Sequence, residues 1–289
     1  MEDTRYIHLE DDRRIAYCEY GDPHGRPVFY FHGTPGSRYE PQLGSDVGRS
    51  CGYRIIALDR PGIGCSDYVR GRRLLDWPKV VEEVAANLDI DRFGVIGFSG
   101  GGPYALACGY AMPDRLAFTV LMGSWGPVTE APSLWQAMAP LDRFFGQLSR
   151  VAPWAFYLPF ALLGYAAKFL PPRALIKSLE SSLSAADKAL LSDEEMVRFF
   201  IEDVEEAFRQ GVRGPADDAI LLYDDWGFDV SEVEVAVDLY HGEEDKFAPF
   251  SYALYLDEKA PRSTLHPYPG EGHLFMMTVF GEVFKQVSS

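Results

Sequence analysis

Short apolar runs alternate along the chain with longer stretches in which apolar residues recur every three or four positions. The later runs, such as VFYF and the last four residues of RIIAL, are continuously apolar, as strands buried on both faces of a parallel sheet require. The first two runs flank the turn residues Asp11 and Asp12, which predicts an antiparallel hairpin. The eight predicted strands are Tyr6–Glu10, Arg14–Tyr20, Pro27–His32, Tyr53–Asp59, Phe93–Phe98, Ala117–Gly123, Ala236–His241 and Ser263–Pro267.

Helical patterns occupy most of the intervals between these strands, which predicts a doubly wound α/β core. The predicted helices are Leu75–Leu88, Gly101–Met112, Phe250–Lys259 and His273–Val287. The alternation breaks between Gly123 and Ala236, where the sequence is helical and aromatic and no strand is predicted. We therefore expect a mostly parallel eight-stranded sheet flanked by helices, with a core of residues 1–125 and 214–289 and an inserted helical cap of residues 126–213.

Charge narrows the range of partners. The 289 residues include 27 Lys and Arg against 43 Asp and Glu, a net charge of −16. Such a chain is a poor electrostatic match for nucleic acid or for an anionic membrane surface. The acidity is local, because residues 181–245 hold 19 Asp and Glu against 4 Lys and Arg. The remaining residues are together close to neutral.

One uncharged stretch, Val151–Ala167, has the minimum length for a membrane span. It contains Pro153 and Pro159, so we expect a buried or groove-lining helix pair and no stable membrane insertion. The first residues lack the basic and apolar regions of a secretory signal, which favours a cytoplasmic location. The four cysteines show no metal-ligand spacing, and we predict neither a metal nor an organic cofactor.

The strongest candidate for chemistry is the segment Gly97-Phe98-Ser99-Gly100-Gly101. It ends a predicted strand and begins a predicted helix, the context in which G-x-S-x-G forms a sharp turn that exposes the serine hydroxyl. Small residues two positions before and after the serine are needed, because larger side chains would clash in the turn. We therefore predict that Ser99 is a nucleophile. The chain has no G-x-x-x-x-G-K-[ST] phosphate-binding pattern.

A nucleophilic serine needs a base and an acid that orients the base. His273 lies in a glycine-rich loop that leaves the last predicted strand, so its side chain can reach across the sheet edge. For the acid, Asp245 follows the preceding strand, with Glu243 and Glu244 as competitors. The order Ser99, Asp245, His273 is the one expected for this arrangement.

The oxyanion of such a reaction is expected to bind to backbone N–H groups. One donor is Gly100, directly after the nucleophile, and the turn after Pro27–His32 supplies the second. We predict the N–H of Thr34 for that role.

Together these segments resemble the α/β-hydrolase superfamily, in the cap-bearing group of HG-x-PG serine hydrolases. The resemblance places the acid at the last residue of HG-x-x-D, which is Asp245, and the serine and histidine at Ser99 and His273. The resemblance extends over the core but includes almost none of the cap. The matching segments are His32–Ser37, Asp59–Asp67, Gly97–Pro103, His241–Asp245 with Pro249, and Gly272–His273.

The resemblance implies acyl transfer, namely hydrolysis of a carboxylic ester or thioester of a small hydrophobic substrate through an acyl-enzyme. A serine at the turn argues against epoxide hydrolases and haloalkane dehalogenases, which carry Asp there. Proline iminopeptidases are the nearest peptidase alternative, although they typically show HGGPG, where this chain has Thr34, and a Trp after the nucleophile, where it has Gly100. Some members of the superfamily act instead as small-molecule receptors, lyases or cofactor-free oxygenases.

Two features of the cap bear on the substrate. A carboxylate among Glu202, Asp203, Glu205 and Glu206 could hold a substrate amine, but their spacing in the amphipathic helix Asp193–Gln210 favours a solvated face. Aromatic residues of the cap are candidates for a hydrophobic pocket, with packing between cap helices as the alternative. These residues are Trp135, Phe144, Phe145, Trp154, Phe156 and Tyr157.

Overall fold

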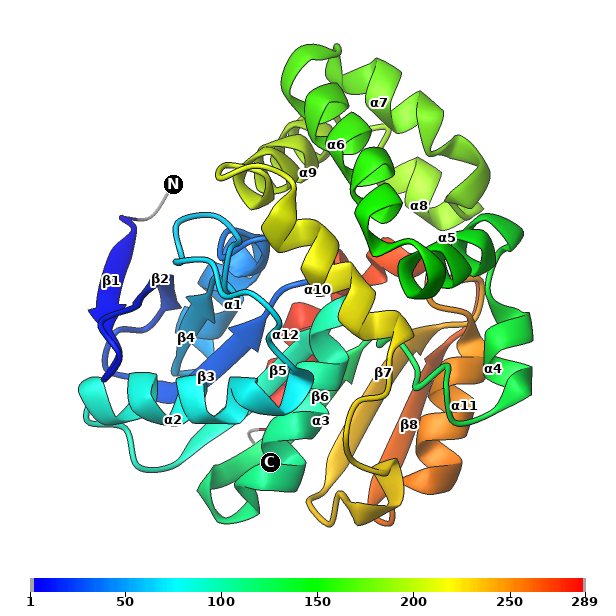
Figure 1. Ribbon diagram of the computed structural model, residues 1–289. Helices are drawn as coiled ribbons and strands as arrows, with labels where there is room; N and C mark the ends of the chain where they lie inside the picture. Colours follow the sequence, from blue (N-terminus) through cyan, green and yellow to red (C-terminus); the bar gives the residue numbers. More distant parts are fainter. Residues whose placement is uncertain (1–2, 288–289) are drawn as a thin grey trace.

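The computed structural model describes residues 3–287 and forms an eight-stranded sheet in the order β1-β2-β4-β3-β5-β6-β7-β8 (Figure 1). β2 pairs antiparallel with β1 and β4, and the other neighbours are parallel, which confirms the predicted hairpin and sheet. The strands are β1 (Arg5–His8), β2 (Arg14–Gly21), β3 (Arg26–Phe31), β4 (Tyr53–Leu58), β5 (Phe93–Phe98), β6 (Leu116–Met122), β7 (Val237–Gly242) and β8 (Ser263–Tyr268).

Helices cover both faces of the sheet, as the apolar strands require. On one face pack α2 (Trp77–Asn87), α3 (Gly102–Ala111) and α11 (Phe250–Lys259). On the other lie α1 (Ser45–Ser50) and α12 (Met276–Gln286). The apolar stripe of α2 and the uniformly small, apolar sequence of α3 account for these positions.

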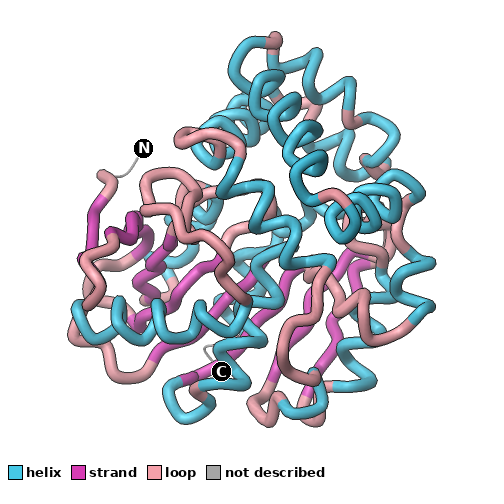
Figure 2. The backbone as a smooth tube through the Cα atoms, viewed as in Figure 1, coloured by secondary structure: helices cyan, strands magenta, loops and turns pink. Residues whose placement is uncertain are grey.

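Seven helices separate β6 from β7 and gather over one end of the sheet (Figure 2). Each of α4 to α7 begins with a proline, whose missing N–H costs nothing at that position. The division into core and cap at residues 126 and 213 stays a prediction. The helices are α4 (Pro132–Ala137), α5 (Pro140–Val151), α6 (Pro153–Phe169), α7 (Pro172–Ser178), α8 (Ala185–Leu190), α9 (Glu194–Ala207) and α10 (Arg213–Tyr223).

The uncharged stretch Val151–Ala167 differs from its prediction. It forms most of the single helix α6, with Pro159 inside, where a helix pair was expected. One side of α6 is exposed, so the prediction of a buried pair is wrong. Within residues 3–287, no helix combines the length and apolar character needed to cross a bilayer.

Short 3-10 helices complete the fold, and two of them carry candidate site residues. They are η1 (Glu40–Gly44), η2 (Leu74–Asp76), η3 (Ser99–Gly101), η4 (Pro113–Arg115), η5 (Glu180–Ser182), η6 (Val230–Glu232) and η7 (His273–Phe275). Because η3 follows β5 directly and η7 follows β8 after a four-residue loop, the topology brings them to the same edge of the sheet.

Candidate active site

Ser99 occupies the sharp turn between β5 and α3. Its φ of 50° lies in the left-handed region, which is strained for a residue with a side chain. A Cβ atom on Gly97 would lie 2.5 Å from the carbonyl oxygen of Gly101, and one on Gly101 would overlap the carbonyl oxygen of Phe31. The small residues around Ser99 are therefore required by the close approach of the backbone.

His273, at the start of η7, lies between a hydroxyl and a carboxylate. Its Nε2 is 3.0 Å from Ser99 Oγ, and its Nδ1 is 2.7 Å from Asp245 Oδ2. Burial favours the neutral ring, but the charge and the hydrogen bond of Asp245 outweigh it and raise the pKa of His273 above 6.5. The rings of Phe98 and Phe247 pack against the imidazole, with their centroids 4.9 and 5.2 Å from the centroid of the imidazole ring. The imidazole is thus oriented as a base toward the hydroxyl.

Asp245 is held in the loop after β7. Its Oδ1 accepts hydrogen bonds from the N–H groups of Phe247 and Ala248, both at 2.9 Å, while Oδ2 lies 2.7 Å from His273 Nδ1 and 3.5 Å from His241 Nε2. The competitors Glu243 and Glu244 point to solvent. The structure therefore brings Asp245, and neither glutamate, to the histidine.

The loop after β3 lies beside the serine turn. A Cβ on Gly100 would overlap the hydroxyl of Thr34, so the Thr34 side chain packs directly against the backbone of Gly100. Among residues 3–287 no acceptor is found for the Thr34 N–H. The Gly100 N–H stands in the first turn of a helix, where donors have no intrahelical acceptor. The pair of oxyanion donors predicted from the sequence, Thr34 and Gly100, therefore lies in adjoining turns.

Asp218 on α10 is a site residue that the sequence reasoning missed. It is fully buried and accepts from the hydroxyl of Thr34 at 2.6 Å, from Tyr104, and from the guanidinium groups of Arg60 and Arg72. Burial alone would raise the pKa of Asp218, but the two arginines lower it well below its ordinary value. Asp218 is therefore a fixed negative charge beside the Thr34 loop.

Arg60 also binds the loop that carries Thr34. Its Nη1 donates to the carbonyl oxygen of His32 at 2.5 Å, and its Nη2 donates to the carbonyl oxygen of Gly33 at 2.9 Å. Arg60 lies in the segment Asp59–Asp67 that carries part of the family resemblance, but the sequence alone assigns no role to it. No local pattern marks its partner Asp218, which lies 158 residues away.

Acidic residues of α9 bind the other end of the same loop, although the sequence predicted that these acids face solvent. Asp203 accepts from the N–H and the hydroxyl of Ser37 at 3.0 and 2.6 Å. Burial raises the pKa of Asp203 to about 7. Only Glu202 and Glu205 of this group are exposed. The prediction that this acidic face of α9 is solvated is wrong for Asp203. Its partner Ser37 lies 166 residues away, so the helix pattern alone does not show the contact.

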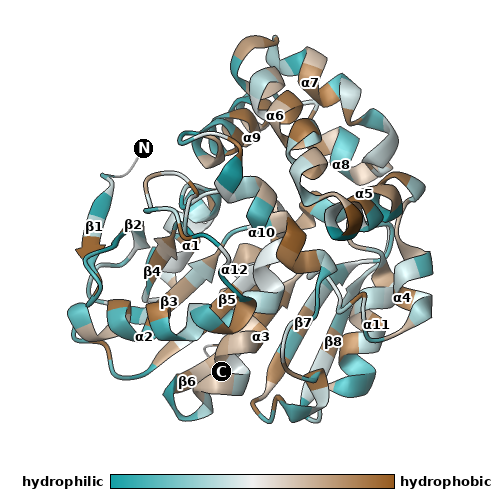
Figure 3. Ribbon diagram, viewed as in Figure 1, coloured by the Kyte–Doolittle hydropathy of each residue, from teal (hydrophilic) through white to brown (hydrophobic). Residues whose placement is uncertain are grey.

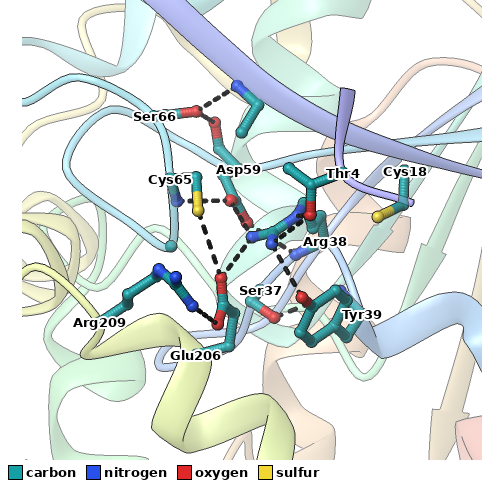
Figure 4. A network of polar contacts seen from close by, with 12 residues as sticks. Thr4, Cys18, Ser37, Arg38, Tyr39, Asp59, Cys65, Ser66, Glu206 and Arg209 are labelled. Carbon is teal, nitrogen blue, oxygen red and sulfur yellow. Dashed lines mark hydrogen bonds and ion pairs between the residues drawn. The ribbon is translucent and has the colours of Figure 1, made fainter. Parts of the chain in front are cut away.

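Figure 4 shows how Glu206 enters the core from α9. Its Oε1 accepts from Arg38 Nη1 at 2.7 Å, and the same guanidinium donates to Asp59 at 2.5 Å. Arg38 and Asp59 are buried, so these are desolvated ion pairs. Since Asp203 and Glu206 are both engaged by core residues, neither is available to bind a substrate amine.

A third acid reaches the turn that carries the histidine. Asp187 on α8 is buried, and its Oδ1 accepts from the N–H of Leu274, the residue after His273, at 2.8 Å. Its Oδ2 accepts from the N–H of Ser184 and so caps α8. Asp187, Asp203 and Asp218 therefore each fasten a helix of the β6–β7 connection to a loop of the site.

The structure brings together only some of the six aromatic residues predicted as a pocket: the rings of Phe144, Phe145 and Phe156 are in contact. Phe156 is fully buried, with its ring centroid 6.2 Å from that of Phe145 and 6.1 Å from that of Tyr223. Trp154 is 81% exposed, so the pocket prediction is wrong for this residue. The others differ among themselves: Phe144 is mostly exposed, whereas Trp135, Phe145 and Tyr157 are half-buried.

Comparison with known proteins places these features in a family. A family model described as alpha/beta hydrolase fold matches residues 26–278. An esterase structure from Exiguobacterium antarcticum superposes with a TM-score of 0.73 over 100% of both chains at 20% identity.

Two curated relatives differ in coverage. A probable proline iminopeptidase from Leptolyngbya boryana is 35% identical over 112 residues, which is 38% of this chain and 35% of the relative. The chain thus aligns with only about a third of the length of that relative. A 2-hydroxy-6-oxononadienedioate/2-hydroxy-6-oxononatrienedioate hydrolase from Cupriavidus pinatubonensis is 26% identical over 93% of this chain and 89% of its own length.

Proposed function

Because the chain belongs to the alpha/beta hydrolase fold family, we propose that it is a serine hydrolase that cleaves a carboxylic ester or thioester of a small hydrophobic substrate. The observation that carries the proposal is the hydrogen-bonded series Ser99 Oγ, His273 Nε2 and Nδ1, and Asp245 Oδ2. This arrangement of hydroxyl, imidazole and carboxylate activates a serine for attack on a carbonyl carbon.

In the proposed reaction, Ser99 Oγ forms a bond to the substrate carbonyl carbon while His273 Nε2 takes the hydroxyl proton. The carbonyl oxygen becomes an oxyanion, which the N–H groups of Thr34 and Gly100 stabilise. The imidazolium is stabilised by Asp245 and gives its proton to the departing alcohol or thiol. Water then attacks the acyl-enzyme by the same steps, releasing the acid and regenerating Ser99.

An aminopeptidase of the proline iminopeptidase type is the second candidate, favoured by the partial similarity to the Leptolyngbya protein. Recognition of a free substrate amine calls for an accessible carboxylate. The buried acids of α9 are bound to Ser37 and Arg38. This engagement, together with Gly100 after the nucleophile, favours the esterase proposal.

The proposal is tested by turnover of p-nitrophenyl esters of increasing acyl length beside proline naphthylamide. We expect hydrolysis of the esters, with preference for apolar acyl groups, and its loss in Ser99→Ala. Removing a triad member lowers the rate by several orders of magnitude, about 10⁴-fold or more. Ser124→Ala is the matched control, since Ser124 is also buried but its hydroxyl bonds to the carbonyl oxygen of Trp125.

The other outcomes separate the alternatives. Cleavage of proline naphthylamide alone would favour the aminopeptidase. Saturable binding of an ester without multiple turnover would favour a receptor. Ester turnover that survives in Ser99→Ala would contradict the proposed nucleophile.

A further inference from the structure

Helix α6 presents an apolar stripe to solvent. Trp154, Leu158, Leu162, Tyr165 and Phe169 are between 60% and 81% exposed. Their spacing of three or four residues places them on one side of the helix, along roughly 22 Å of its axis. These five residues are here called the α6 stripe. Scattered exposed apolar side chains are ordinary, but a continuous row of large ones marks an interaction surface.

The opposite side of α6 is already used for packing within the chain. Phe156 and Ala167 are buried there, and the rings of Phe160 on α6 and Phe208, just after α9, lie 6.3 Å apart. The helix is thus apolar on all sides but buried on only one, as its hydrophobic colouring in Figure 3 illustrates. Together with α7, it forms the top of the molecule in the view of Figure 1.

The segment of the chain that contains the α6 stripe has a net charge of the opposite sign to that of the whole protein. Residues 140–177 contain five Lys and Arg but a single Asp, whereas the whole chain has a net charge of −16. Arg150, Lys168, Arg173 and Lys177 are exposed. The ammonium group of Lys168 lies 5.5 Å from the centre of the Phe169 ring, beside the stripe. Helix α9, which packs against α6, carries the exposed acids Glu202 and Glu205, so the basic excess belongs to α5, α6 and α7 alone.

We propose that the α6 stripe is a docking site for an anionic phospholipid surface. The helix would lie in the plane of the headgroups, with the stripe in the acyl boundary and the lysine and arginine side chains among the phosphates. Apolar residues with Trp and Tyr on one side and basic residues beside them are typical of such interfacial helices. No span is implied.

A second copy of the chain fits this surface less well. Two-fold pairing through α6 would bring two surfaces with the same excess of positive charge together, and like charges oppose association. A single convex helix also offers a narrow contact, whereas a stable protein interface buries on the order of 800 Å² on each partner. A fluid lipid surface needs no matching groove.

The test uses the full-length protein and flotation with vesicles of phosphatidylcholine containing a minority of phosphatidylglycerol. We expect binding by the wild type, with weaker binding in high salt and to pure phosphatidylcholine. The double variant Leu158→Glu with Leu162→Glu should bind at least about tenfold more weakly. Leu254→Glu on α11 is the matched control, because Leu254 is 52% exposed and lies outside the stripe.

Fluorescence gives a second readout that does not depend on a destabilising change. Trp154 is 81% exposed, so vesicles should shift the wild-type emission to shorter wavelength, and Trp154→Phe should remove that shift. Absence of wild-type binding, or equal binding by the stripe and control variants, would overturn the proposal. So would a dimer, seen by sedimentation velocity, that the stripe variant dissociates while neither form binds vesicles.

Discussion

Two buried aspartates on neighbouring helices hold opposite ends of the loop around Thr34, in contrasting electrostatic surroundings. Asp218 on α10 bonds to the Thr34 hydroxyl and faces two guanidinium groups. Asp203 on α9 bonds to Ser37, and no Lys or Arg among residues 3–287 forms an ion pair with it. The buried acid Glu40 lies nearby, since both carboxylates approach the same side of Gly36, and the charges of Asp59 and Glu206 also raise the pKa of Asp203.

The difference shows that burial alone does not decide the charge of a carboxyl group. Both side chains are desolvated, which disfavours the ionised form. At Asp218 the arginines reverse that effect and the pKa falls, whereas at Asp203 the pKa rises to about 7. The loop that carries the proposed oxyanion donor is therefore fastened by one permanent charge and by one group that titrates near neutral pH.

Of the substitutions at these two aspartates, Asp218→Asn should lower the free energy of unfolding the most. The amide keeps the shape but removes the charge, leaving Arg60 and Arg72 buried without a counterion. Breaking a buried pair in this way costs about 3–5 kcal/mol. We expect a loss of that size in the free energy of unfolding, measured with urea, and a lower kcat because Thr34 loses its anchor. A change below about 1 kcal/mol would contradict the role of the pair.

Asp203→Asn should have a smaller effect, and its sign should depend on pH. The pKa of Asp203 is 3.8 in the unfolded chain and about 7 in the folded one, so the folded state binds the extra proton. Wild-type stability from this group is complete below the lower value and is lost as the pH rises through the higher. Relative to the wild type, the variant should therefore gain stability as the pH rises from acidic toward neutral and above.

Unfolding in urea at several pH values measures this gain. Glu202→Gln is the control, because Glu202 lies on the same helix but is exposed, and it should change stability by less than about 0.5 kcal/mol at every pH. A difference between wild type and Asp203→Asn that does not vary with pH would show that Asp203 is charged throughout, like Asp218.

The features that the sequence predicted are those that depend on short-range rules. Each of the eight strands was predicted to within two residues at either end. The first two flank a turn, and several later ones contain continuous apolar runs. The residues around Ser99 indicated a sharp turn, since only small side chains fit where backbone approaches backbone. The placement of His273 after the last strand then followed from the parallel topology.

The contacts that the sequence did not predict are those between distant segments. Asp187, Asp203 and Asp218 lie in a strongly acidic stretch, which read alone indicates solvated surface. Their partners stand far away along the chain, and a single sequence carries no sign of such pairing. The α6 stripe shows the opposite error: an uncharged helix was predicted to be buried, and half of it faces solvent.

The most direct test of the proposed chemistry is the covalent labelling of Ser99 by a fluorophosphonate, followed by intact-mass analysis and peptide mapping at several pH values. A neutral His273 is required to accept the serine proton, and its pKa is raised by Asp245. We predict one adduct per chain, located on Ser99, absent in Ser99→Ala, and forming more slowly as the pH falls through the raised pKa of His273. An adduct on another residue, or labelling of Ser99 at a rate that does not change with pH, would contradict it.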